Sequence, residues 1–277
     1  MKKRVLVTGI AVVLAAGLLY LCARSLSGFG FGSGSGGRSA ADVTESLPAT
    51  LKAAAMYESA GDYRKARGRY LSALEKYPAS RDTAKIQESI DDLNIKIILS
   101  PAETPDSFRY EVKKGDTISR ISREFRNTTE LIMRANGLKD TSIVPGEKLK
   151  INRSRFSIWV SKSSNLLALK SDGVTIKVYW VSTGRNNSTP AGNFSVTTRI
   201  VDPPWYKDNK VIPSGSPENI LGTRWMGISK KSYGIHGTTE PQSIGKQATA
   251  GCVRMRNTDV EELFALAPVG TEVTIVE

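Results

Sequence analysis

The N-terminal part of the chain combines a short basic segment with a long apolar one. Basic residues 2–4 precede an uncharged stretch from Val5 to Ala23. As a helix, this stretch would span about 28 Å, close to the ~30 Å hydrocarbon core of a bilayer. The positive flank predicts a cytoplasmic N-terminus and export of the rest of the chain. Residues 1–24 are therefore expected to form a transmembrane helix.

A cleaved signal peptide is the main alternative to this anchor. Its hydrophobic region normally has about 7–15 residues and precedes a small-x-small cleavage site, whereas this apolar run is longer and has no convincing site. Cys22 also suggests a lipoprotein. The signal for lipid attachment, however, needs a small residue directly before the cysteine, and this chain has Leu21 there. An uncleaved anchor is favoured over removal.

Beyond the anchor, the pattern changes twice. Residues 25–49 open with a Gly/Ser-rich stretch that has no apolar period, which predicts a flexible linker. Residues 50–100 carry apolar positions at helical spacing in three successive stripes. The third stripe is Ile86, Ile90, Leu93 and Ile97. The run AGDYRKARGRYLSALEKYP resembles the middle of a tetratricopeptide (TPR) repeat. One repeat is visible where solenoids need about three, so a stalk or small adaptor is favoured over a peptide-binding groove.

Residues 108–153 follow the order strand, helix, helix, strand. The predicted strands begin at Tyr110 and Lys148. Asp116 or Thr117 is well placed to cap the first helix, and Asn136-Gly137 to end the second. The segments VKKGDTISRIS, ANGL and VPGEKL make this region resemble the lysin motif (LysM) over nearly its whole length. That resemblance implies affinity for the N-acetylglucosamine-containing chains of peptidoglycan or chitin. The alternative is that these Gly and Pro residues only shape a small fold.

Residues 155–277 have the pattern of a mainly-β domain. Strand-like segments are bounded by turns such as Ser171-Asp172-Gly173. Only Asp259 to Ala267 is clearly helical. An all-β sandwich or barrel fits this pattern. The predicted strands are Phe156–Ser161, Asn165–Lys170, Val174–Ser182, Asn193–Ile200 and Val273–Val276.

The charge of the chain adds little to this assignment. A net charge of +12 favours anionic partners such as nucleic acid, acidic lipids or an acidic envelope polymer. The basic residues are scattered, however, and a solvated basic face explains them. The sequence contains no zinc finger and no RNA-binding aromatic motif, and the predicted topology points outward. Nucleic-acid binding is therefore disfavoured.

Cysteine and histidine are the informative residue types. The chain has two cysteines, Cys22 in the apolar span and Cys252 near the C-terminus, and one histidine, His236. Exported proteins usually pair their cysteines or avoid them, so a solitary exported thiol suggests a chemical task. An imidazole beside it can accept its proton, or hold the thiolate as an ion pair with a lowered pKa. A single histidine does not make a typical zinc site, and no metal or cofactor is expected.

The residues around this pair are small. The histidine lies in GIHGT and the cysteine in TAGCVRMRN. Gly237 and Gly251 are expected to leave room for a substrate backbone beside each reactive side chain. The N–H groups of Gly251 and Cys252 are expected to form an oxyanion hole, in which each donor is worth roughly 10²–10³ in rate.

Residues 155–277 resemble the catalytic domain of the L,D-transpeptidases. The segments that carry the resemblance are STGRNNSTPAG, DPPWYKDNKVIP, PENILGTRWMGIS, YGIHGTTEPQSIGK and TAGCVRMRNTDVEEL. The signature is a His, about fifteen residues, and then Ser/Thr-x-Gly-Cys. It implies that Cys252 is the nucleophile and that His236 is the base, oriented by a backbone carbonyl near Gly237. Many members carry a second His at the position of Ala250, so a role for that imidazole is in doubt here.

The resemblance also implies a substrate-binding set around the catalytic pair. Thr249 and Gly251 would shape the turn at the cysteine, and Arg254 would either bind a substrate carboxylate or brace the loop. The implied substrate-binding residues are Tyr233, Gly237, Thr249, Gly251 and Arg254.

The implied reaction is a two-step acyl transfer on peptidoglycan stem peptides at the outer face of the cytoplasmic membrane. The cysteine attacks the third stem residue and expels D-Ala, and the thioester then passes to another stem to give a 3→3 cross-link. Water as acceptor would give an L,D-carboxypeptidase instead. A non-catalytic wall-binding scaffold remains the alternative from another class.

Overall fold

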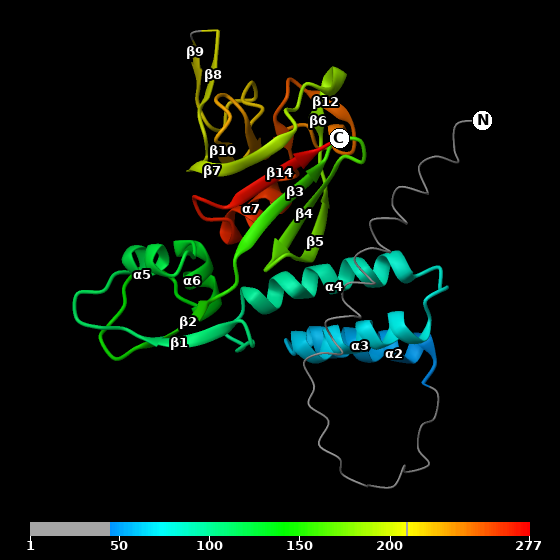
Figure 1. Ribbon diagram of the computed structural model, residues 1–277. Helices are drawn as coiled ribbons and strands as arrows, with labels where there is room; N and C mark the ends of the chain where they lie inside the picture. The colour runs from blue at the N-terminus through cyan, green and yellow to red at the C-terminus, as the bar shows by residue number, and fades with distance from the viewer. Residues whose placement is uncertain (1–44, 209) are drawn as a thin grey trace, which may run out of the picture. The chain divides into compact units, whose positions relative to one another are not determined.

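The structure is a computed structural model that describes residues 45–208 and 210–277 (Figure 1). The chain divides into two compact units, with the boundary between Ile97 and Ile98. The predicted anchor, residues 1–24, lies outside the described residues, as does most of the predicted linker. Within the described ranges, every helix is too short or too polar to cross a bilayer.

Three helices make up the described part of the first unit: α2 (Leu47–Ser59), α3 (Tyr63–Lys76) and α4 (Thr83–Ile98). Asp62 begins α3 as its N-cap by accepting a hydrogen bond from the backbone N–H of Lys65. The cluster at their centre includes Ala73, Leu74, Ile86 and Ile90. All four residues of the third predicted stripe are buried, so the helical expectation for this segment is confirmed.

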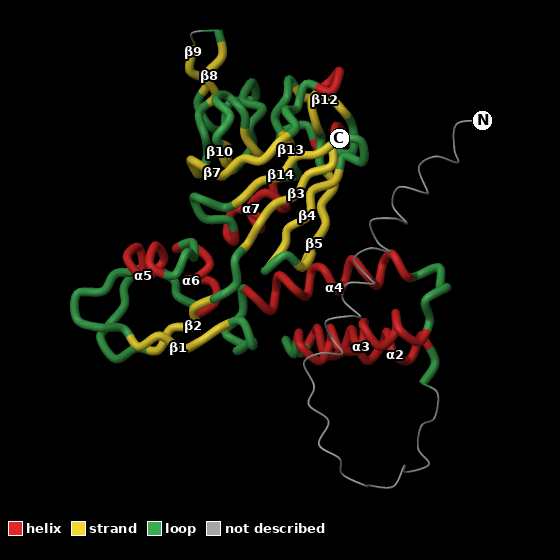
Figure 2. The backbone as a smooth tube through the Cα atoms, viewed as in Figure 1, coloured by secondary structure: helices red, strands yellow, loops and turns green. Residues whose placement is uncertain are grey.

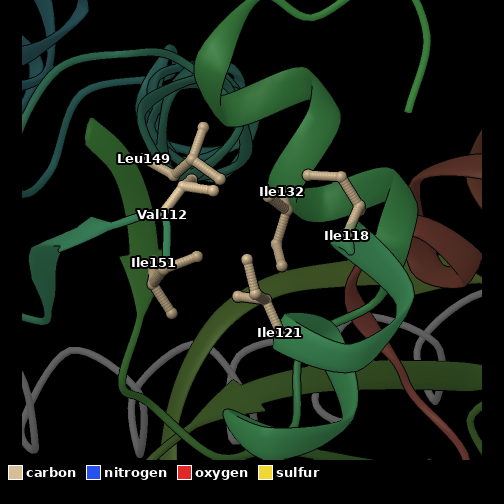
Figure 3. Close-up of a cluster of buried hydrophobic side chains, with 6 residues drawn as sticks. All are labelled: Val112, Ile118, Ile121, Ile132, Leu149 and Ile151. Atoms are coloured by element: carbon tan, nitrogen blue, oxygen red, sulfur yellow. The ribbon is translucent and has the colours of Figure 1, made fainter. Parts of the chain in front are cut away.

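The next segment folds as the predicted βααβ module. Its elements are β1 (Ser107–Glu111), α5 (Ile118–Glu124), α6 (Thr129–Asn136) and β2 (Lys148–Asn152). The strands pair antiparallel. Figure 3 shows the buried cluster between strands and helices, formed by Val112, Ile118, Ile121, Ile132, Leu149 and Ile151.

Local hydrogen bonds decide how the helices of this module begin and end. Thr117 is the N-cap of α5, with its hydroxyl 3.2 Å from the N–H of Arg120. Asp116 accepts instead from the N–H of Lys113 and from the Tyr110 hydroxyl. Gly137 ends α6 with φ +65°, a conformation that costs glycine little.

Residues 156–276 form one eight-stranded mixed sheet, in the order β13-β11-β10-β7-β14-β3-β4-β5. Figure 2 shows part of this sheet, with β14, β3, β4 and β5 side by side. The β-rich expectation is therefore confirmed, but a second packed sheet or closed barrel is not what the described strands form. The strands of the domain are β3 (Phe156–Ser161), β4 (Leu166–Ser171), β5 (Val174–Trp180), β6 (Thr183–Gly184), β7 (Gly192–Val201), β8 (Trp205–Lys207), β9 (Lys210–Ile212), β10 (Arg224–Ile228), β11 (Gly234–His236), β12 (Gln247–Thr249), β13 (Val253–Arg254) and β14 (Glu272–Val276).

The long strand β7 makes the sheet curve. Its first half pairs with β14 and its second half, from Val196, pairs with β10. One strand thus pairs with two groups of strands and joins them into one sheet. Helix α7 (Asn257–Leu266) packs against β10 and β11, with Val260 and Leu263 fully buried. The short ribbons β6–β12 and β8–β9 complete the domain.

Helices α6 and α7 also contact each other. The hydroxyl of Thr128, the N-cap of α6, donates to the carbonyl of Ala265 and accepts from the N–H of Leu131. One buried hydroxyl therefore both begins a helix of the LysM-like module and bonds to the β-rich domain.

Candidate active site

The sheet fixes His236 from two sides. His236 is the last residue of β11, which pairs antiparallel with β10 and parallel with β13. Its partners in the register are Trp225 and Arg254. Its carbonyl accepts from the N–H of Met255 at 2.8 Å. With only 3% of its surface exposed, the histidine sits in a rigid and dry position.

A backbone carbonyl sets the tautomer of this ring. His236 Nδ1 lies 2.7 Å from the carbonyl oxygen of Gly237. Because a carbonyl oxygen only accepts, Nδ1 carries the hydrogen and Nε2 of the neutral ring is left as the base. The contact is the one that the sequence led us to expect.

Cys252 lies beside Gly234, at the end of β11 opposite to His236. Its Sγ is 3.8 Å from the carbonyl oxygen of Ser232, and the N–H of Gly234, the first residue of β11, acts on the thiol. The β11–β13 register, continued by one residue, pairs Gly234 with Cys252. In a parallel pair, partner residues point to the same face and residues two apart share it. His236 at the end of β11 and Cys252 directly before β13 therefore share one face of this strand pair, and Arg254 acts electrostatically on both.

Burial shifts the acidity of both groups toward their neutral forms. It lowers the pKa of His236 to about 4, against the opposing effect of the Gly237 and Leu221 carbonyls, and the charge of Arg254 adds to the lowering. Burial also raises the pKa of the Cys252 thiol, although the Gly234 N–H and Arg254 act the other way. The resting protein thus favours a neutral thiol and a neutral imidazole over a preformed ion pair.

Two family models match the chain in this region. One for the L,D-transpeptidase catalytic domain, YkuD, matches residues 155–275, and one for the LysM domain matches residues 110–152. YkuD of Bacillus subtilis, a protein named as an L,D-transpeptidase, is 35% identical over 173 residues, which cover 60% of this chain and 97% of that protein. The chain belongs to the L,D-transpeptidase family. The predicted order, a LysM domain followed by an L,D-transpeptidase domain, is confirmed.

Other relatives of this L,D-transpeptidase match shorter stretches. YqjB of Bacillus subtilis, also named as an L,D-transpeptidase, is 44% identical over 124 residues, which cover 43% of this chain and 69% of that protein. Among solved structures, an L,D-transpeptidase from Mycobacterium smegmatis aligns with a TM-score of 0.40 and 16% identity, over 49% of this chain and 65% of that one. The catalytic domain from the E. faecium L,D-transpeptidase aligns with a TM-score of 0.37 and 24% identity, over 44% of this chain and 96% of that one.

The turn that presents Cys252 is held by Thr249. Its hydroxyl donates to the carbonyl of Cys252 at 2.7 Å and accepts from the N–H of Gly251 at 3.1 Å. Thr249 therefore has the bracing position that we expected. The same contact corrects the expected oxyanion hole, because the N–H of Gly251 is already engaged by the threonine. Of the expected pair, the Cys252 N–H is the donor that Thr249 does not engage.

Close packing explains why residues 237 and 251, beside the catalytic pair, are glycines. A Cβ on Gly237 would lie 2.2 Å from Asn257 Oδ1, and one on Gly251 would lie 2.7 Å from the Tyr233 ring. Gly251 also has φ +139°, where a side chain is strained. On the side where a Cβ would stand, protein atoms occupy the space, and substrate access beside these two backbones stays a prediction from the sequence.

Arg254 is committed to an internal ion pair. Its Nη1 lies 2.6 Å from Glu240 Oε2 and 3.0 Å from Ser243 Oγ, and the residue is 5% exposed. Of the two roles left open by the sequence, this geometry favours bracing the 240–243 segment over binding a substrate carboxylate.

Sequence reasoning missed two neighbours of the histidine. The indole of Trp225 stacks on its ring, and the side chain of Asn257 holds the loop that follows it. Neither residue is unusual in the sequence, since both lie in segments that matched the family as a whole. Only their register and packing single them out. Among the described residues, no cluster of three or more Asp, Glu, His and Cys side chains is arranged to hold a metal ion.

Proposed function

We propose that this L,D-transpeptidase acts on peptidoglycan stem peptides through a thioester on Cys252, with His236 as the acid–base group. The family supports the reaction class and the substrate. The observation that carries the residue assignment is the contact between His236 Nδ1 and the Gly237 carbonyl. With Nδ1 protonated, Nε2 is the ring nitrogen that can take a proton. The thiol of Cys252 lies beside Gly234, the first residue of the strand that ends at His236.

The directions of the two pKa shifts specify how the reaction begins. Because burial favours the neutral form of the thiol and of the imidazole, His236 is expected to remove the thiol proton as Cys252 attacks, rather than beforehand. The sulfur bonds to the carbonyl carbon of the third stem residue. The bond to the terminal D-Ala breaks, and the imidazolium returns the proton to its amine.

The second step reverses these roles. The neutral imidazole takes a proton from the side-chain amine of another stem, the amine attacks the thioester, and the thiol is regenerated. The product is a 3→3 cross-link.

The LysM domain gives the enzyme a second contact with its substrate. We propose that it binds the glycan strands and so keeps the catalytic domain at the cell wall, outside the cytoplasm. The transmembrane anchor at residues 1–24 stays a prediction from the sequence. Separation of membranes from wall and soluble fractions, with the full chain and a chain lacking residues 1–24, tests it.

Incubation with a carbapenem tests the nucleophile. Mass spectrometry of the full chain is expected to show one covalent adduct on Cys252 and none in Cys252→Ala. Cys22→Ser is the matched control, because it removes the other thiol of the chain and is expected to leave the adduct in place. Full adduct formation in Cys252→Ala would refute the assignment.

Incubation with a disaccharide-tetrapeptide distinguishes the acceptors. Cross-linked dimers with release of D-Ala support transpeptidation, whereas tripeptide alone identifies an L,D-carboxypeptidase. No turnover, with glycan binding that survives Cys252→Ser, would identify a non-catalytic wall-binding scaffold.

A further inference from the structure

One side-chain oxygen joins two loops next to the catalytic pair. Asn257, the first residue of α7, accepts two backbone hydrogen bonds at Oδ1. The donors are the N–H of Thr238, at 2.9 Å, and the N–H of Thr223, at 3.3 Å. The side chain therefore ties the start of the helix to the loop after β11 and to the loop before β10.

The Thr238 N–H belongs to the peptide group whose carbonyl orients the histidine. That carbonyl is the oxygen of Gly237, which accepts from His236 Nδ1 at 2.7 Å. One planar peptide therefore connects the two contacts, with the imidazole at its carbonyl end and Asn257 at its N–H end. Hydrogen bonds in such a chain polarise one another, so each strengthens the next.

Glycines make room for this oxygen. A Cβ added to Gly222 or to Gly237 would lie 2.2 Å from Asn257 Oδ1. The Gly222 Cβ would also lie 2.3 Å from the Thr238 nitrogen. Gly222 has φ +65°, a conformation that other residues adopt only at a cost. Two backbone segments thus approach closely enough for one amide oxygen to bond to both.

We propose that Asn257 is a positioning residue for the acid–base chemistry of His236, acting through the Gly237–Thr238 peptide. The proposal rests on the function proposed above. When the imidazole takes the thiol proton, the Nδ1–H bond to the carbonyl becomes charge-assisted and stronger. The peptide is polarised further, and the amide oxygen at its N–H end stabilises that polarisation. The Gly237 carbonyl thereby takes the place that a side-chain carboxylate takes in other triads, and Asn257 supports that carbonyl from the N–H end of the same peptide.

The charge of a neighbouring arginine acts against the imidazolium. Among the described residues, Arg254 on β13 is the charged group that acts on His236, and its charge lowers the pKa of the ring. Cys252 is the titratable group beside the same strand. Asn257 is neutral, so its effect on the ring passes through the orientation and polarity of the peptide and is separable from that of Arg254.

Three variants of the full chain separate positioning from folding. Asn257→Asp keeps the accepting oxygen and adds a negative charge beside the N–H of Thr238. Asn257→Ala removes the acceptor. Thr258→Ala is the matched control, because it alters the same helix turn at an exposed residue whose hydroxyl donates to the neighbouring Asp259 carboxylate. His236 is the single histidine of the chain, so its titration is read directly by NMR of the ring, alongside the rate of carbapenem acylation.

Asn257→Asp is expected to raise the pKa of His236, because the added charge favours the imidazolium. Asn257→Ala is expected to slow acylation by roughly 10–100-fold at unchanged folded fraction, by analogy with the loss when the group that orients a metal-ligating histidine is removed. Thr258→Ala is expected to change neither quantity.

An unchanged histidine titration in Asn257→Asp would overturn the proposal, as would acylation in Asn257→Ala that is slowed no more than in Thr258→Ala. If the alanine variant does not fold, the titration of the aspartate variant decides alone. The titration does not depend on the identity of the nucleophile. A shifted titration together with full activity in Cys252→Ala would therefore refute the proposed function and leave the positioning role intact.

Discussion

The indole of Trp225 stacks on the imidazole of His236, with ring centroids 5.8 Å apart and ring planes inclined by 23°. The two residues are direct partners in the β10–β11 register. A Cβ on Gly234 would lie 2.7 Å from the same indole, so Trp225 also covers the start of β11. One aromatic side chain thus shields the strand that leads from the thiol to the base.

Removal of this indole is expected to change the acidity of the base. Trp225→Ala lets water reach the ring, and because burial is the main cause of the lowered pKa of His236, that pKa should rise from about 4 toward 6.5. NMR titration of the single histidine measures the change. Trp159→Ala, which removes an indole from β3, is the control and should leave the titration unchanged. No rise in Trp225→Ala would contradict the role of the stack.

The lowered pKa of His236 also predicts acid sensitivity. The unfolded chain protonates its histidine near pH 6.5, whereas the folded chain resists protonation until about pH 4. The stabilisation is therefore complete above pH 6.5 and is lost as the pH falls to 4, by about 3 kcal/mol over a shift of this size. Denaturant unfolding at pH 7 and pH 4 measures it. His236→Gln should lack this contribution, and an equal pH dependence in both proteins would refute the prediction.

The ion pair of Arg254 predicts a stabilising role for an otherwise ordinary glutamate. Glu240→Ala leaves a guanidinium that is 5% exposed without its carboxylate, and we expect a loss of about 1–3 kcal/mol in the free energy of unfolding. The exposed Glu218 gives the control, since Glu218→Ala should change stability by less than about 0.5 kcal/mol. Equal stability of the two variants would show that the pair contributes nothing.

The close contact at Gly237 predicts a coupling between two positions. Gly237→Ala places a methyl group 2.2 Å from Asn257 Oδ1, and such overpacking should cost about 1–3 kcal/mol. In combination with Asn257→Gly, which removes the obstructing oxygen, the added cost of the alanine should be smaller. Unfolding measurements on both single variants and the double variant give the coupling energy. Strict additivity would contradict the predicted contact.

The sequence by itself determined much of this protein. Apolar periodicity located the three N-terminal helices, the βααβ module and five of the eight strands of the main sheet, because burial of one face sets the period of each element. The family resemblance identified an L,D-transpeptidase domain after a LysM domain, and the spacing of Cys252 and His236 predicted the catalytic pair.

The tertiary structure decided how each residue is used, since contacts between residues far apart in the sequence leave no local pattern. Alternation of apolar residues is the same in a sandwich and in one curved sheet, so only strand pairing revealed that β7 bends the sheet. The sequence did not reveal that Gly237 packs against Asn257, where a Cβ would clash with the amide oxygen. Arg254 had two possible roles until Glu240 was found beside it. The physical reason is common to all three: the partner of a side chain, and hence its charge state and function, is fixed by the fold and not by its neighbours in sequence.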